Sequence, residues 1–171
     1  MSVSGITETA LYLTFILEDE TFAIDVSQVR EVLDMSRITK VPRTPDFLKG
    51  VINVRGTVVP VVDFRLKFGM PGADTTVHTR IMILEIPLDN KTVVVGAIAD
   101  SVNDVIEFEP DRIEPPPEIG SRWRSDFIKG IGKRDDKFIM IIDVSMVFST
   151  EEIALVGATG QEGNPENQET G

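Results

Sequence analysis

The feature that most constrains the fold of this chain is an internal repeat. The segment FLKGVINVRGTVVPVVDF at 47–64 recurs without a gap as FIKGIGKRDDKFIMIIDV at 127–144, 80 residues later. Four pairs of positions are identical: Phe47 and Phe127, Lys49 and Lys129, Gly50 and Gly130, and Asp63 and Asp143. Most of the remaining positions exchange one apolar residue for another. The repeat therefore predicts a structural unit that the chain builds twice.

The similarity extends beyond this segment to a Val-x-acid-Val motif that occurs once in each half. The motif pairs Val29, Glu31 and Val32 with Val102, Asp104 and Val105. An Arg-Ile pair followed by a proline also occurs twice, at 37–42 and 112–117. Each half of about 70 residues is too short for a solenoid but suits a small β-barrel, whose curled sheet hides its edges. We therefore expect two small barrels that pack together through apolar residues.

Strand signals dominate the chain. Runs of β-branched and aromatic residues bounded by Gly, Asp, Asn and Pro are typical of strands. Paired runs predict four hairpins, at 12–24, 51–62, 81–98 and 130–142. The clearest helix signal lies at 149–153, where Ser149 and Glu152 have the spacing of a capping box. The sequence thus predicts an all-β protein with a short C-terminal helix.

The composition excludes several classes of function. A net charge of −11 opposes nucleic-acid binding, which needs a clustered basic surface. The absence of cysteine excludes disulfides and thiolate sites. No secretory signal and no apolar stretch of membrane-spanning length are apparent, so we expect a cytoplasmic protein without direct membrane insertion. The segment 157–171 has three glutamates, no basic residue and no large apolar residue, and is expected to be a disordered acidic tail.

The chain offers little for catalysis. His78 is its only histidine and lies in a polar stretch that we interpret as the linker between the halves. Without a second histidine or a cysteine, the chain lacks a nucleophile–base pair and a nitrogen or sulfur metal site. Asp63 and Asp143 end equivalent strands of the repeat, which favours structural turns or caps over a catalytic carboxylate pair. We predict a protein without enzymatic activity, metal or cofactor.

Binding is the function that these observations leave. The two copies of the repeat differ at the hairpin connection, where Arg55 stands between apolar flanks and is a candidate contact residue. Glu31 carries the opposite charge and is a candidate partner for Arg55. Trp123 follows a proline run, and it fits either a cover for one end of the second barrel or an interface anchor.

Three blocks give the chain a specific resemblance to a known family. They are RITKVPRTPDFLKGVINVRGTVVPVVDFRLKF at 37–68, VVVGAIADSVNDVIEFEPDRIEPPPEIG at 93–120, and the second repeat segment at 127–144. In their residues, order and spacing they resemble CheW, the adaptor of bacterial chemotaxis arrays. The resemblance covers about Tyr12 to Leu155.

The resemblance implies a fold and its extent. CheW-like proteins have two small five-stranded SH3-like β-barrels around a shared hydrophobic core. For this chain we expect a CheW-like domain at 12–155, with one barrel at about 12–73 and the other at about 79–148. An exchange of terminal strands between the barrels is left open. The acidic tail at 157–171 is not part of the family core.

The resemblance also implies partners and contact residues. CheW-like proteins have no enzymatic activity and connect the cytoplasmic tips of methyl-accepting chemotaxis receptors to the histidine kinase CheA, whose regulatory domain is itself CheW-like. The implied receptor-binding positions are Val29, Glu31, Gly50, Arg55, Val102 and Val105. Ile119 occupies a kinase-binding position. We expect the two Val-x-acid-Val segments to line one groove for a receptor helix, and rings to form with CheA.

Two alternative interpretations stay open. A CheW-like scaffold can serve another receptor–kinase pathway, such as surface motility. A small β-barrel can also bind a small ligand or an oligonucleotide, although the acidic charge and the aliphatic interior oppose this function.

Overall fold

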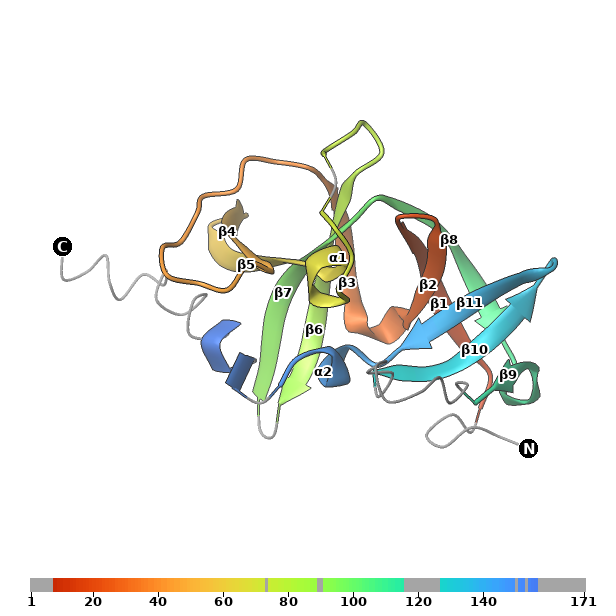
Figure 1. Cartoon of the computed structure of the whole chain (residues 1–171). Coiled ribbons are helices and arrows are strands. Elements are labelled where there is room, and N and C mark those ends of the chain that lie inside the picture. Colours follow the sequence, from red (N-terminus) through yellow and green to blue (C-terminus); the bar gives the residue numbers. More distant parts are fainter. Residues whose placement is uncertain are drawn as a thin grey trace.

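The structure is a computed structural model of the chain, and it describes residues 8–72, 74–88, 91–115, 127–149, 151–152 and 154–156. Figure 1 shows two strand-rich units side by side, each built on one curled sheet. The protein is all-β with a few short helical turns, as its strand-rich sequence predicts. Among the described helices, none is long and apolar enough to cross a membrane.

One unit contains a five-stranded sheet with the order β3-β6-β7-β5-β4. Its strands are β3 (Val29–Asp34), β4 (Leu48–Val54), β5 (Thr57–Asp63), β6 (Arg80–Leu88) and β7 (Lys91–Ala99). Neighbouring strands are antiparallel except β5 and β7, which run parallel with Val61 opposite Gly96. The short helix α1 (Phe64–Lys67) follows β5.

The other unit contains a six-stranded sheet with the order β8-β1-β2-β11-β10-β9. Its strands are β1 (Ala10–Leu17), β2 (Glu20–Asp25), β8 (Ser101–Phe108), β9 (Ile113–Glu114), β10 (Ile128–Arg134) and β11 (Lys137–Ile142). Its helical turns are η1 (Val26–Gln28), η2 (Pro110–Arg112) and α2 (Val144–Val147). This sheet thus has one strand more than the expected five, because the two-residue β9 is added at its edge.

The two sheets do not follow the order of the chain. The N-terminal hairpin of β1 and β2 pairs with β8 and β11, so it shares a sheet with the last strands. The hairpin of β6 and β7 pairs with β3 and β5 instead. The barrels expected at 12–73 and 79–148 therefore exchange whole hairpins. β1–β2 joins strands of the second half, and β6–β7 joins strands of the first half. The chain crosses between the sheets at η1 and at Asp100, which alone separates β7 from β8.

Three apolar clusters fill the two units. The largest takes residues from both sheets, including Phe15 of β1 and Leu84 of β6, and this confirms the shared hydrophobic core. A smaller cluster around Ile106 lies within the six-stranded unit, and another around Ile52 lies within the five-stranded unit. The aliphatic residues before the two repeat aspartates are all buried: Val61, Val62, Ile141 and Ile142. Each such side chain contributes about 1.5–3 kcal/mol to folding.

The predicted C-terminal helix is confirmed by its capping box. The backbone N–H of Ser149 donates to Glu152 Oε1 at 2.8 Å, and the N–H of Glu152 donates to Ser149 Oγ at 3.1 Å. Residues 151–152 and 154–156 are helical, and Val156 is buried in the shared core. Lys67 Nζ lies 2.9 Å from Glu152 Oε1, so an ion pair holds this helix against α1. The tail at 157–171 lies outside the described residues.

Candidate protein-docking surface

The two Val-x-acid-Val motifs form edge strands. β3 is the first strand of the five-stranded sheet, and β8 is the first strand of the six-stranded sheet. An edge strand lacks a partner strand on one side and is therefore open to contact with another protein. The repeat thus presents the same motif at one edge of each unit.

A β-bulge gives the first motif its geometry. In a regular strand, Val29 and Val32 would point to opposite faces, because side chains alternate. Here Val29 lies opposite Leu84 and Val32 lies opposite Met82, so β3 advances three residues while β6 advances two. Opposite residues of an antiparallel pair point to the same face. Both valines therefore lie on the face that carries Leu84 and Met82, which belong to the shared core.

The second motif repeats this arrangement. Val102 lies opposite Phe15 and Val105 lies opposite Leu13, again with three residues of β8 against two of β1. Phe15 and Leu13 also belong to the shared core. Val102 and Val105 therefore share the face of the six-stranded sheet that points to the centre of the molecule.

The four valines form two matching rows, which we call the valine rows: Val29 with Val32, and Val102 with Val105. Val29 and Val102 pack against the shared core, whereas Val32 and Val105 are 38% and 51% exposed. Each row begins at the core and ends at the surface. One row lies on each unit, so the separation of the rows depends on how the two units are held together.

The predicted pairing of Glu31 with Arg55 is confirmed. Each of the two guanidinium Nη atoms of Arg55 donates to one carboxylate oxygen of Glu31, at 2.6 Å in both cases. Glu31 lies in β3 and Arg55 in the β4–β5 turn, so the pair joins the first and last strands of the five-stranded sheet. The hydrogen bonds from Arg55 lower the pKa of Glu31 below its ordinary value. The Arg55 side chain is 73% exposed, so the pair adds little stability and remains accessible to a partner.

The backbone at Arg55 is strained. Arg55 has a φ of +50° and Gly56 a φ of +87°, at the two central positions of the β4–β5 turn. A type I′ turn requires positive φ at both positions and favours Asn, Asp or Gly there. Arginine is disfavoured in this region because its Cβ crowds the backbone. An unfavourable conformation at a surface turn marks a candidate for function.

Gly50, one of the expected receptor-binding positions, lies inside the fold. It is buried with a φ of +146°, and a Cβ there would lie 2.1 Å from the carbonyl oxygen of Thr39. Thr39 forms an isolated β-bridge with Val51, so Gly50 lets the segment before β4 pack against this strand. Its contact with a receptor stays a prediction. Ile119 and Trp123 lie outside the described residues.

Sequence reasoning missed a buried ion network. The Arg65 side chain is 5% exposed, and its Nε and Nη2 donate to Asp63 at 3.0 Å while its Nη1 donates to Asp100 at 2.6 Å. The hydrogen bonds to Asp63 are the main cause that raises the pKa of Arg65 above its ordinary value. Asp100 also accepts the N–H of Glu18 at 2.6 Å. The order Asp63-x-Arg65 at the end of a buried strand is the one sequence signal that could have indicated this ion network.

Phe138 is a second missed feature. It is 62% exposed on β11, and Lys133 Nζ lies 5.7 Å from its ring centroid. Lys133 lies opposite Phe138 in the β10–β11 pair, so its ammonium group covers part of the exposed ring.

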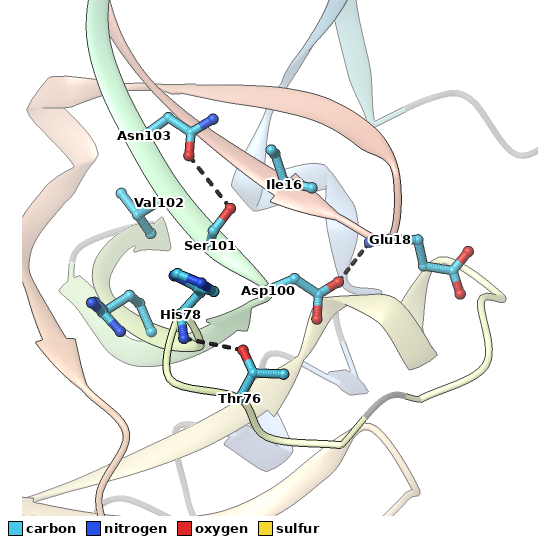
Figure 2. A pocket seen from close by; sticks show the side chains of 9 residues that line it. Ile16, Glu18, Thr76, His78, Asp100, Ser101, Val102 and Asn103 are labelled. Carbon is cyan, nitrogen blue, oxygen red and sulfur yellow. Dashed lines mark hydrogen bonds between the residues drawn. The ribbon is translucent and has the colours of Figure 1, made fainter.

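The described residues carry no arrangement that suits catalysis. Asp63 and Asp143 both act as caps: each accepts the backbone N–H two residues later, at 2.9 and 3.1 Å, as predicted. His78 is exposed in the loop before β6 and lines a pocket of about 420 Å³ with Asp100 and Val102 (Figure 2). Within the described ranges, no three His, Asp or Glu side chains gather closely enough to hold a metal ion.

Comparison with known proteins identifies the family. Residues 11–152 match the family model of the CheW-like domain. The chain belongs to the CheW-like family. It is 32% identical to the chemotaxis protein CheW of Klebsiella aerogenes over 90% of each chain. It is 33% identical to CheW of Bacillus subtilis, over 81% of this chain and 86% of that one.

The chain is also similar to a relative with another name and to a solved structure. Protein FrzA of Myxococcus xanthus is 31% identical over 70% of this chain and 72% of its own. The crystal structure of the scaffolding protein TtCheW from Thermoanaerobacter tengcongensis matches with a TM-score of 0.73 and 36% identity, over 84% of this chain and 94% of that one. The fold of this chain is therefore similar to that of TtCheW.

Proposed function

We propose that this CheW-like chain is a non-catalytic adaptor that couples methyl-accepting chemotaxis receptors to the histidine kinase CheA in a cytoplasmic signalling array. One observation carries the proposal: the bulged edge strands place one valine row on each unit of a CheW-like fold. A protein with two matched apolar rows and no converging reactive groups among the described residues is suited to docking.

The receptor surface consists of the valine rows and the Glu31–Arg55 pair. Val32 and Val105 offer exposed aliphatic surface, one on each unit, and Arg55 adds an exposed guanidinium on the five-stranded unit that carries Val32. Apolar anchors flanked by a charged group suit the helix-in-groove mode, in which a helix places its apolar face between two walls. The proposed receptor-binding residues are Val29, Glu31, Gly50, Arg55, Val102 and Val105.

The kinase surface is proposed to use a separate region that includes Ile119. Two small units offer separate ends, so an adaptor of this shape can hold a kinase without covering its valine rows. A partner domain with the same fold packs end to end in heterologous contacts, and such contacts close into rings when the rotation allows.

Charge reversal at Arg55 tests the receptor surface. Arg55→Asp places two carboxylates side by side and removes the exposed guanidinium. We expect an unchanged far-UV circular dichroism spectrum and at least tenfold weaker co-sedimentation with receptor-containing membranes, because a like-charge contact costs more than a lost ion pair. Lys91→Asp, at an exposed lysine that begins β7, is the matched control with the same charge change. Normal assembly by Arg55→Asp would rule out this site.

A second candidate is a scaffold in another receptor–kinase pathway, such as surface motility. The similarity to Protein FrzA supports this second candidate, because a relative with a name other than CheW is similar over 70% of this chain. Affinity purification from native lysate, followed by identification of the kinase bound, separates the two candidates. Recovery of CheA supports the chemotaxis array, and recovery of a different histidine kinase supports the second candidate.

A further inference from the structure

Asp100 is the single residue between β7 of one sheet and β8 of the other. Its backbone N–H donates to the carbonyl of Ile16 at 2.9 Å, and its Oδ2 accepts the N–H of Glu18 at 2.6 Å. Figure 2 shows the second of these bonds at the start of β8. Both partners lie at the end of β1 or just after it, so these bonds fix Asp100 to the six-stranded sheet. Val102 follows two residues later, and its place depends on how Asp100 is held.

Arg65 holds the same residue from the five-stranded sheet. Its Nη1 donates to Asp100 Oδ1 at 2.6 Å, and its Nε and Nη2 donate to Asp63 at 3.0 Å. Asp63 ends β5 and is 1% exposed, which makes it a rigid anchor. A planar guanidinium that bridges two carboxylates fixes their separation and orientation, because each bond is charge-assisted and directional.

The second copy of the repeat has the cap without the bridge. Ser145 occupies the position equivalent to Arg65, and its hydroxyl donates to Asp143 at 2.6 Å. This bond stays within one turn of the chain, whereas the Arg65–Asp100 bond spans 35 residues and joins two sheets. The cross-unit contact is therefore a feature of the first copy alone.

We propose that Arg65 is a positioning residue that sets the separation of the two valine rows by holding Asp100 at the crossing between the units. Its effect on receptor binding rests on the function proposed above, whereas its effect on the geometry does not. Arg65 is buried and therefore out of reach of a docking protein, so it acts through the placement of β8.

The geometric part is tested with spin labels. The chain has no cysteine, so Asp34→Cys on β3 and Glu107→Cys on β8 introduce one exposed label on each unit. We expect Asp100→Asn to broaden or shift the distance distribution between the labels. Asp143→Asn is the matched control: it makes the same change at the equivalent cap of the second copy, which has no bond to the crossing, so the distribution stays narrow. Equal changes in both variants, or no change in either, would overturn the proposal.

Receptor binding supplies the second readout. Asp100→Asn is expected to weaken binding of purified receptor tips by about three- to thirtyfold, as substitutions that alter coupling between regions do. Asp143→Asn is expected to lower the melting temperature through the loss of a helix cap but to leave binding unchanged. A purely structural role of Arg65 predicts that binding falls with the melting temperature in both variants. If the native chain fails to bind receptor tips, the proposed function is wrong, and the spin-label result still decides the role of Arg65.

A second variant covers the case in which Asp100→Asn does not fold. Arg65→Lys keeps the charge, but an ammonium group does not reproduce the fork that holds both carboxylates. We expect it to broaden the label distribution as well. A narrow, native distribution in Arg65→Lys would contradict the proposal.

Discussion

The two hairpins of the repeat, β4–β5 and β10–β11, have the same backbone plan. Each pairing shifts register at the matching glycine, between Leu48 and Gly50 in one copy and between Ile128 and Gly130 in the other. The N–H of Asp63 donates to the carbonyl of Phe47 at 2.7 Å, and the N–H of Asp143 donates to the carbonyl of Phe127 at 2.7 Å. These shared features account for the matched phenylalanines, glycines and aspartates as requirements of strand entry, bulge and cap.

The side chains that differ between the copies make the long-range contacts. Arg55 and Asp135 both have a φ of +50° at the same turn position. Among the described residues, only Arg55 of this pair bonds to an edge strand at the opposite end of the sheet order, through Glu31 of β3. Arg65 reaches the other unit through Asp100, whereas Ser145 bonds only within its own turn. The two copies thus share their backbone plan, while the long-range contacts between strands and between units are made at positions where the copies differ.

Truncation of the two caps is expected to give the largest difference between the copies. Asp63→Ala removes a buried partner of Arg65, and we expect the free energy of unfolding to fall by about 3 kcal/mol or more. Asp143→Ala removes only a helix cap, and we expect a loss of about 1 kcal/mol. Urea denaturation of the two variants measures the difference. Equal losses would show that the Arg65 network adds nothing beyond the cap.

The glycines provide the next largest effect. Gly50→Ala puts a Cβ 2.1 Å from the carbonyl oxygen of Thr39, so the bridge between Thr39 and Val51 has to shift, at a cost of about 2–3 kcal/mol. Gly56→Ala has open space around its Cβ and only the penalty of a left-handed backbone, about 1 kcal/mol. Thermal denaturation ranks the two variants. A milder effect at Gly50 would mean that the segment before β4 moves freely.

Asparagine at the two turn positions separates stability from binding. Arg55→Asn and Asp135→Asn both place a residue that tolerates positive φ, so we expect each melting temperature to stay within about 3 °C of the native value. Receptor co-sedimentation is expected to weaken for Arg55→Asn and to stay unchanged for Asp135→Asn. A loss of binding in both variants would show that the turns, rather than the guanidinium, form the contact.

The smallest expected effect concerns pH. Because hydrogen bonds from Arg55 lower the pKa of Glu31 below its ordinary value of 4.5, the stability from this pair is complete above that value. It is lost as the pH falls through the lowered pKa. A carboxyl-carbon NMR titration is expected to report the lowered pKa in the native chain and a return toward 4.5 in Arg55→Asn. An unchanged titration in Arg55→Asn would show that another group causes the shift.

The acid of the second motif uses a different contact, which explains why this prediction applies to one copy. Asp104 bonds through its backbone: its N–H donates to Thr14 Oγ1 at 3.0 Å, and its carbonyl accepts from the same hydroxyl at 2.9 Å. The Thr14 side chain thus satisfies the bulge of β8. In the first motif, the side chain of Glu31 instead bonds to Arg55 and so joins the first and last strands of the five-stranded sheet.

The local elements of this protein can be read from the order of its residues. All four predicted hairpins are present, as β1–β2, β4–β5, β6–β7 and β10–β11. Ser149 and Glu152 form the predicted capping box, and the two repeat aspartates form the predicted caps. Strand propensity, turns and caps act between residues close in sequence, so their signals are readable in the order of the residues.

The assembly of these elements into two sheets depends on long-range contacts. Which hairpin joins which sheet depends on pairing between segments far apart, and the sequence did not specify that β1 and β2 would lie beside β8 and β11. The spacing of Val29 and Val32 implied opposite faces, and only the bulge brought both to one face. The Arg65–Asp100 bond joins residues whose separation in sequence carries no periodic signal. Side-chain direction and cross-unit contacts are set by register and packing, which exist only once the sheets have formed.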